Sequence, residues 1–147
     1  MLKIVTGDLF TAETQTIVNT VNCVGAMGKG IALEFKKRYP DMFTKYKSLC
    51  ERGLIQVGML WLYKAPDKWI LNFPTKDHWK NNSQPQYLIS GLGKFVKTYK
   101  EKGITSISFP LLGANNGGLD PKLVLDLMTN FLKQVDIPVH IYNNQVK

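Results

Sequence analysis

The segment TIVNTVNCVGAMGKGIALEFKK, residues 16–37, carries the pattern that decides the fold. Its first part, Thr16–Val21, alternates polar and β-branched side chains, which is typical of a β-strand. Asn22–Gly30 is rich in glycine and predicts a loop. Ile31–Lys37 then has the composition of a helix, which we expect to stop near Tyr39-Pro40 because the residue before a proline avoids helical backbone. A strand, a glycine-rich loop and a helix in this order indicate an α/β protein.

The rest of the chain continues this alternation. Strands are expected where short apolar or β-branched runs lie between turn residues, at Leu2–Val5, Met59–Tyr63, Trp69–Phe73, Ile104–Phe109 and Pro138–Tyr142. Further helices are expected at Asp41–Glu51, Leu88–Tyr99 and Pro121–Val135, and in the last two the apolar residues recur on one face. The prediction is a single domain over residues 1–147, an α/β fold built as a three-layer α/β/α sandwich with a central mixed sheet.

Length and composition fit that prediction. The 147 residues are 44% hydrophobic and 20% charged, which is ordinary for one globular domain. No apolar run approaches the roughly 18 residues of a membrane span, and two cysteines without a motif are typical of a reduced cytosolic protein. His78 and His140 lie far apart and have no cysteine or carboxylate cluster at metal-ligand spacing. We therefore expect a cytoplasmic protein with no membrane partner, no metal and no cofactor.

Charge is the unusual property of this chain. Lysine and arginine number 19 against 11 acidic residues, which gives a net charge of +8. Such a balance favours polyanionic partners, nucleic acid first among them, although lysines also serve simply to solvate helix faces. Trp79-Lys80 and Lys68-Trp69 place an aromatic ring beside a cation, which suits base stacking next to a phosphate contact.

Two glycine-rich loops are candidates for holding a phosphorylated ligand. They cover residues 22–30 and 111–120, and each one precedes a predicted helix. Successive backbone N–H groups at the start of a helix form an anion site, and glycine lets the backbone approach the ligand closely. In open α/β sheets, ligands lie beyond the carboxyl ends of the strands. Both loops and Thr75-Lys76 follow predicted strands, so we expect them to meet on one rim. Neither loop has the spacing of a Walker A or a dinucleotide-binding motif.

Lys76 and Asp120 are the candidate reactive groups. A lysine is most often a surface ion partner, but Phe73-Pro74 before Lys76 and Trp79 after it would shield the amine from water. Shielding lowers a lysine pKa and frees the lone pair for nucleophilic attack. Asp120 stands directly before Pro121, a combination typical of a helix N-cap, and capping is compatible with a chemical role.

In combination, these motifs resemble the macrodomain family of ADP-ribose-binding α/β/α modules, over nearly the whole chain. Residues 5–9 resemble the family's first strand with its adenine-binding aspartate. Residues 18–22 and 28–32 resemble its second strand and ribose loop, and residues 109–113 and 117–120 resemble its phosphate loop. Within the family the chain looks most similar to DarG-type macrodomains, which remove ADP-ribose from thymine in DNA. It is also similar to the terminal ADP-ribose protein glycohydrolases.

The resemblance implies roles for individual residues. Lys76 matches the catalytic lysine, and Asp120 matches the carboxylate that the protein-directed relatives use. Trp79 and Lys80 are our candidates for touching DNA beside the modified base. The resemblance places ADP-ribose against Asp8, Leu9, Asn22, Met27, Gly28, Lys29, Gly30, Ile31, Leu112, Gly113, Ala114, Asn115, Asn116, Gly117, Gly118 and Leu119.

The function that we expect from this resemblance is hydrolysis of the bond between ADP-ribose and thymine in single-stranded DNA. The expected partners are ADP-ribose, the ADP-ribosylated DNA and a DNA ADP-ribosyltransferase toxin. DarG-type antitoxins usually carry a further C-terminal domain that binds the toxin, and these 147 residues do not include it. The alternatives are a glycohydrolase for glutamate-linked ADP-ribose on proteins, a non-catalytic ADP-ribose reader, and a plain basic nucleic-acid-binding domain.

Overall fold

A six-stranded sheet forms the centre of the molecule, in the order β1-β6-β5-β2-β4-β3. The structure is a computed structural model, and it describes residues 1–114 and 117–144. Its strands are β1 (Leu2–Val5), β2 (Thr16–Val21), β3 (Trp61–Lys64), β4 (Trp69–Pro74), β5 (Ile107–Pro110) and β6 (Val139–Tyr142). Its helices are the short 3-10 helix η1 (Leu9–Thr11) and the α-helices α1 (Gly30–Arg38), α2 (Pro40–Glu51), α3 (Pro85–Thr98) and α4 (Pro121–Leu132).

The sheet is mixed, as predicted. β1, β6, β5, β2 and β4 run parallel to one another, and only β3 runs antiparallel, paired with β4. β2 and β4 are paired along their whole length, from Thr16 opposite Trp69 to Val21 opposite Pro74. Because these strands are parallel, the loops that follow them leave the sheet at the same edge.

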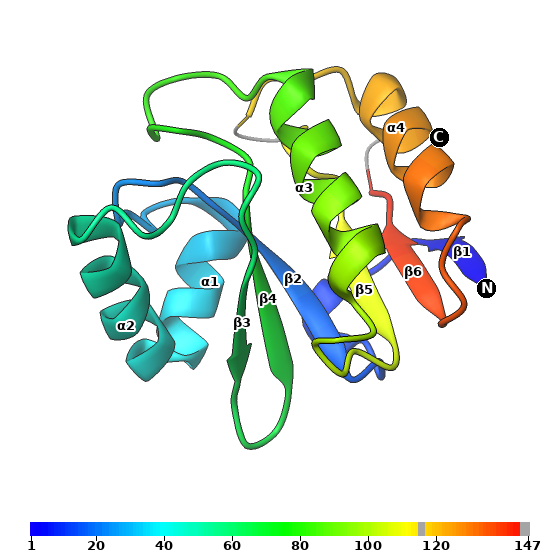
Figure 1. Cartoon of the computed structure of the whole chain (residues 1–147), viewed down its shortest axis with the longest axis horizontal. Helices are drawn as coiled ribbons and strands as arrows, with labels where there is room; N and C mark the ends of the chain where they lie inside the picture. The colour runs from blue at the N-terminus through cyan, green and yellow to red at the C-terminus, as the bar shows by residue number, and fades with distance from the viewer. Residues whose placement is uncertain (115–116, 145–147) are drawn as a thin grey trace.

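Two helices cover each face of the sheet (Figure 1), which confirms the three-layer sandwich. Successive residues of a strand point to opposite faces, and β2 shows this directly. Ile17 packs with Phe35 and Met42 under α1 and α2. Val18 packs with Leu88 and other residues under α3 and α4. The two cores thus lie on either side of one sheet, and each is closed by an amphipathic helix pair.

Four element boundaries differ from the sequence-based prediction by two residues or more. α3 begins at Pro85, ahead of the predicted Leu88, because a proline is well placed in the first turn of a helix. β3 begins at Trp61 because Met59 closes a turn, with its N–H donating to the carbonyl of Gln56 at 3.1 Å. β5 begins at Ile107 because the N–H of Ile104 returns to the carbonyl of Tyr99 at 3.0 Å. α4 ends at Leu132, before the predicted Val135. Ile104 and Val135 are nevertheless buried, whereas Met59 is 44% exposed, so the hydrophobic pattern extends beyond the backbone element in these last three cases.

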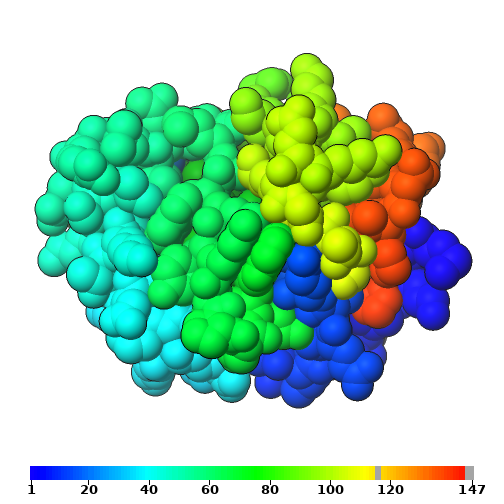
Figure 2. Space-filling model, turned by 60° about the horizontal axis from the view of Figure 1, so that its bottom comes forward, coloured from blue at the N-terminus to red at the C-terminus, as the bar shows by residue number. Residues whose placement is uncertain are grey.

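The end of the sheet at which the parallel strands begin is covered by the β3–β4 hairpin and by the segments that lead into β2, β5 and β6. Figure 2 turns this end toward the viewer and shows the green hairpin at the surface beside the cyan helices. Lys68 in the hairpin donates from Nζ to the carbonyls of Ala12 and Thr14, at 2.9 and 2.6 Å. Among the residues that the structure describes, no helix combines the length and apolar character needed to cross a bilayer.

Candidate functional site

A cavity of about 830 Å³ lies at the carboxyl ends of the five parallel strands. Segments that follow β1, β2, β4, β5 and β6 all contribute to its lining. The expectation that both glycine-rich loops and Lys76 meet on one rim is therefore confirmed. Of the residues that we singled out from the sequence, the cavity is lined by Asp8, Leu9, Asn22, Gly28, Lys29, Ile31, Lys76, Trp79, Lys80, Gly113 and Gly117.

The first loop is held in shape by the side chain of Asn22. Its Oδ1 accepts hydrogen bonds from the N–H groups of Val24 and Ala26, at 3.0 and 3.3 Å, and its Nδ2 donates to the carbonyl of Ala26 at 2.8 Å. The hydroxyl of Tyr46 in α2 lies 2.9 Å from the same Oδ1 and 2.7 Å from the carbonyl of Asn22. Asn22 is 8% exposed. Its amide therefore shapes the loop from within, and the loop presents its backbone to the cavity.

That loop runs directly into α1. Gly30 is the first residue of the helix and has a φ of +58°, a left-handed conformation that glycine adopts without strain. The N-cap residue Lys29 makes no side-chain capping bond. The first N–H groups of a helix have no partner within the helix and carry partial positive charge. Gly28, Lys29 and Ile31 line the cavity beside them, so this wall suits an electronegative ligand group.

The segment after β4 joins the two glycine-rich loops. At its start, the N–H of Thr75 donates to the carbonyl of Val21 at 2.9 Å, and the N–H of Cys23 donates to the carbonyl of Asp77 at 3.2 Å. At its end, the N–H of Ser83 donates to the carbonyl of Gly117 at 2.9 Å. Backbone hydrogen bonds at both ends therefore hold the segment that carries Lys76.

Lys76 lies partly buried on this segment and lines the cavity. Its Nζ donates to the carbonyl of Trp79 at 3.3 Å. Removal of water around the amine lowers the pKa of Lys76 below its ordinary value, and the positive charge of Lys29 lowers it further. A larger share of Lys76 is consequently neutral at a given pH than for a lysine in water, which is what a nucleophilic amine requires.

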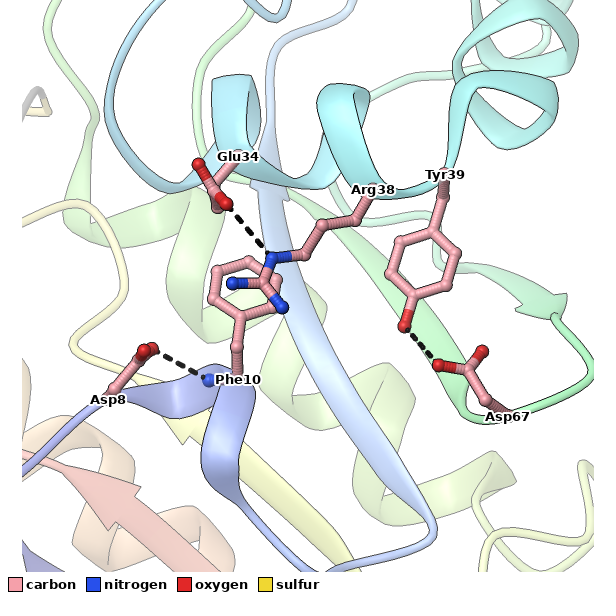
Figure 3. Close-up of polar contacts among 6 residues, drawn as sticks. All are labelled: Asp8, Phe10, Glu34, Arg38, Tyr39 and Asp67. Atoms are coloured by element: carbon pink, nitrogen blue, oxygen red, sulfur yellow. Dashed lines mark hydrogen bonds and ion pairs between the residues drawn. The ribbon is translucent and has the colours of Figure 1, made fainter.

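Asp8 and Phe10 also line the cavity, and Figure 3 shows the contacts around them. Asp8 caps η1, because its Oδ1 accepts from the N–H of Phe10 at 2.9 Å. The guanidinium of Arg38 in α1 stacks over the Phe10 ring at 4.4 Å and also bonds Glu34 at 3.0 Å. Next along the helix, the hydroxyl of Tyr39 donates to Asp67 at 3.1 Å. The Arg38–Phe10 contact therefore joins the η1 turn to α1, and the Tyr39–Asp67 bond joins the end of α1 to the β3–β4 hairpin.

The second loop follows β5 and provides the phosphate-loop candidates. Gly113 and Gly118 have φ values of +69° and +77°, which L-residues with side chains rarely adopt. The N–H of Leu119 donates to the carbonyl of Gly113 at 3.0 Å and closes the turn. Gly113 and Gly117 line the cavity. Asn115 and Asn116 lie outside the described residues.

Several candidates do not line the cavity, and their roles remain predictions. Met27 and Leu112 are 2% and 0% exposed and belong to the two cores. Asp120 is exposed and holds the N-cap backbone conformation of α4, as expected, but its side chain makes no capping bond. The remaining predicted residues outside the lining are Gly30, Ala114, Gly118 and Leu119.

Sequence reasoning missed a group of lining residues that come from distant parts of the chain. Asn144 is one: it exchanges two hydrogen bonds of 2.9 Å with the backbone of Gly7, and both residues line the cavity. No local sequence pattern predicts this contact, because it depends on the pairing of β1 with β6. Phe10, Asn82 and Tyr142 are the other lining residues that we did not expect at the cavity. The segments that we did expect there contribute further lining residues without individual predicted roles, namely Thr20, Val21, Ala26, Ala32, Thr75, Pro110 and Leu111.

Comparison with known proteins identifies the class to which this fold and cavity belong. Residues 18–128 match the model of the Macro domain family, and the chain belongs to that family. The macrodomain of Mycobacterium tuberculosis DarG superimposes with a TM-score of 0.94 at 43% sequence identity, covering 99% of both chains. A Thermosipho africanus DarTG structure in complex with ADP-ribose superimposes with a TM-score of 0.94 at 37% identity, covering 99% of this chain and 43% of that one.

The curated relatives are longer proteins. The Mycobacterium tuberculosis "DNA ADP-ribosyl glycohydrolase" is 43% identical over 147 residues, which is 97% of this chain and 42% of that protein. A Thermosipho africanus "DNA ADP-ribosyl transferase-DNA ADP-ribosyl glycohydrolase fusion protein" is 37% identical over 160 residues, covering 96% of this chain and 41% of the fusion. The chain thus spans less than half the length of these relatives.

Proposed function

We propose that this macro domain hydrolyses the N-glycosidic bond between ADP-ribose and thymine in single-stranded DNA, and that it counteracts a DNA ADP-ribosyltransferase toxin. The observation that carries the proposal is the position of Lys76. This lysine lines a cavity between two glycine-rich loops and has a lowered pKa. The names of the relatives support the substrate assignment, since four of them are called DNA ADP-ribosyl glycohydrolases or fusions containing one.

The proposed binding mode divides the cavity between the parts of ADP-ribose. Asp8 accepts from the adenine amine, and Leu9 packs against the ring. Backbone N–H groups around Gly113 and Gly117 hold the diphosphate, and the first loop with the start of α1 holds the distal ribose. This order follows from chemistry: a carboxylate accepts from an amine, and glycine-rich turns favour anions.

The proposed reaction uses the amine of Lys76 as the nucleophile. Nζ attacks the anomeric carbon, and the bond to the base nitrogen breaks with its electron pair leaving on the base, which takes up a proton. The ribose ring opens to give a Schiff base, and water then adds to the imine carbon and releases ADP-ribose and the free amine. Asp120 is our candidate for moving protons. Because Asp120 lies outside the cavity lining, this role requires it to act at the rim.

Nucleic acid fits the charge at the mouth of the cavity. Lys29, Lys76 and Lys80 all line it, and the ammonium of Lys80 lies 5.2 Å from the ring of Trp79. Trp79 is 49% exposed, a high fraction for a tryptophan. An exposed ring beside lysines can stack on a base while the cations contact phosphates. Binding of modified DNA should therefore weaken with salt more steeply than binding of free ADP-ribose.

The test is a paired incubation of the protein with an ADP-ribosylated thymidine oligonucleotide and with a peptide that carries glutamate-linked ADP-ribose. Release of ADP-ribose from the oligonucleotide is the expected result. Release from the peptide alone would replace the proposal with a protein-directed hydrolase. Tight binding of ADP-ribose without any release would indicate a reader, and no binding at all would leave only a basic nucleic-acid-binding domain.

A further inference from the structure

Ser83 has a buried hydroxyl that no established role explains. It lies at the end of the segment between β4 and α3 and is 3% exposed. Its backbone N–H donates to the carbonyl of Gly117 at 2.9 Å. Its Oγ has no hydrogen-bond partner in the part of the chain that the structure describes. Buried polar atoms are nearly always satisfied in folded proteins, so an unsatisfied one calls for a specific reason.

The hydroxyl abuts the loop that lines the diphosphate end of the cavity. A Cβ added at Gly117 would lie 2.5 Å from Ser83 Oγ and 2.3 Å from the carbonyl oxygen of Gly113. A Cβ added at Gly113 would lie 3.1 Å from the same Oγ. Side chains at 113 and 117 are therefore excluded, and the hydroxyl faces bare backbone. A small displacement of that backbone would bring a peptide group within hydrogen-bond distance of the hydroxyl.

We propose that Ser83 is a positioning residue whose hydroxyl makes its hydrogen bond to the backbone around Gly113 and Gly117 when a diphosphate occupies the cavity. The inference rests on the proposed binding of ADP-ribose. The diphosphate draws N–H groups toward itself, and the loop backbone moves with them. In the complex, the Ser83 hydroxyl thereby gains a hydrogen bond that stabilises the bound conformation of the loop. In the free protein the same hydroxyl has no such bond.

The position of Ser83 gives this bond a second consequence. Ser83 and Lys76 lie on one segment, which is bonded to the end of β2 through Thr75 and to the first glycine-rich loop through Asp77. The far end of this segment is already tied to Gly117 by the N–H of Ser83, and a hydroxyl bond to the loaded phosphate loop adds a second tie there. Occupation of the diphosphate site and placement of Lys76 are thereby coupled.

The test compares Ser83→Ala with wild type in two measurements. Removal of an unsatisfied buried hydroxyl relieves a desolvation cost in the ligand-free protein, so we expect its Tm to stay level or to rise by about 2–4 °C. Removal of a bond made in the complex should weaken ADP-ribose binding about tenfold or more by calorimetry. Adenosine, which has no phosphate, should bind the variant as it binds wild type.

Ser108→Ala is the matched control. Ser108 is 0% exposed, like Ser83 a buried serine, but its Oγ lies 2.8 Å from Thr14 Oγ1 and is satisfied. This substitution should lower the Tm and leave ADP-ribose affinity unchanged. A lowered Tm for Ser83→Ala, an unchanged affinity for ADP-ribose, or an equal loss with adenosine would each overturn the inference. Wild type that fails to bind ADP-ribose would overturn the proposed function as well, so the two failures are distinguishable.

Discussion

The N–H of Cys23 donates to the carbonyl of Asp77 at 3.2 Å, which ties the first glycine-rich loop to the segment that carries Lys76. The thiol of Cys23 adds a weak bond to the carbonyl of Lys76 at 3.4 Å. Both contacts go to backbone, so they fix the path of the chain without engaging the Lys76 amine, which instead bonds the carbonyl of Trp79 at 3.3 Å. The geometry of the candidate nucleophile is thus set by a neighbouring loop, far away in sequence.

Replacement of Lys76 by alanine should abolish most of the proposed activity without abolishing ligand binding. A positioned catalytic group is commonly worth roughly 10²–10⁴ in rate, so we expect a loss of at least that size in ADP-ribose release. Affinity for free ADP-ribose should stay close to wild type, as calorimetry can show. Lys97→Ala, on the exposed face of α3, is the matched control. Wild-type turnover by Lys76→Ala would rule out the lysine mechanism.

The rate of ADP-ribose release should rise with pH, and the rising part of the pH–rate profile should follow deprotonation of the Lys76 amine. Only the neutral amine is nucleophilic, and desolvation followed by the charge of Lys29 lowers the pKa of Lys76 from the ordinary 10.5. The midpoint of this rising part should therefore lie below 10.5, measured as the logarithm of the single-turnover rate against pH. Lys29→Gln removes one cause of the lowering and should move the midpoint toward higher pH. A midpoint unaffected by this change would remove Lys29 from the explanation.

Asn22→Ala should destabilise the protein and weaken ADP-ribose binding together. The substitution removes the acceptor of the Val24 and Ala26 N–H groups, and leaving such groups unpaired costs about 1–3 kcal/mol. Urea unfolding and calorimetry measure the two effects. Tyr46→Phe removes a hydroxyl that donates a hydrogen bond to Asn22 Oδ1, and Tyr46 itself does not line the cavity. It should cost about 1 kcal/mol of stability and leave affinity nearly unchanged; an equal loss of affinity in both variants would contradict the distinction.

Two glycines of α3 should respond to alanine with opposite signs. A Cβ at Gly91 would lie 2.3 Å from Cζ of Phe73, deep in the core, whereas a Cβ at Gly93 meets its nearest atom, on Phe131, at 3.9 Å. Gly91→Ala should lower the free energy of unfolding by about 1–3 kcal/mol through overpacking. Gly93→Ala should raise it by about 0.5–1 kcal/mol through helix propensity. Urea denaturation of the pair tests the packing directly, and a stable Gly91→Ala protein would mean that Phe73 can move aside.

Much of the fold could be predicted because each strand or helix has its own local pattern of apolar and polar residues. The alternation in Thr16–Val21 and the apolar face of Leu88–Tyr99 each follow from the geometry of one strand or one helix. The strand ends were harder to place, as Met59 and Ile104 show. Both are apolar residues that continue a hydrophobic run, but their backbone groups bond within turns. Ile104 is buried without belonging to β5, whereas Met59 is 44% exposed, so an apolar run does not by itself fix where a strand begins.

For the candidate site, the sequence by itself determined which chemical groups are present and that they follow predicted strands of a mixed sheet. Glycine-rich turns after two strands and a lysine after a third must share an edge once those strands are parallel. Only the tertiary structure decided which of these groups reach the cavity. Met27 turned into the core while Lys29, two residues away, lines the opening. The contact of Gly7 with Asn144 arises from strand pairing between the two ends of the chain. Local patterns specify the conformation of a segment, whereas the neighbours of a side chain are set by packing between segments that are remote in sequence.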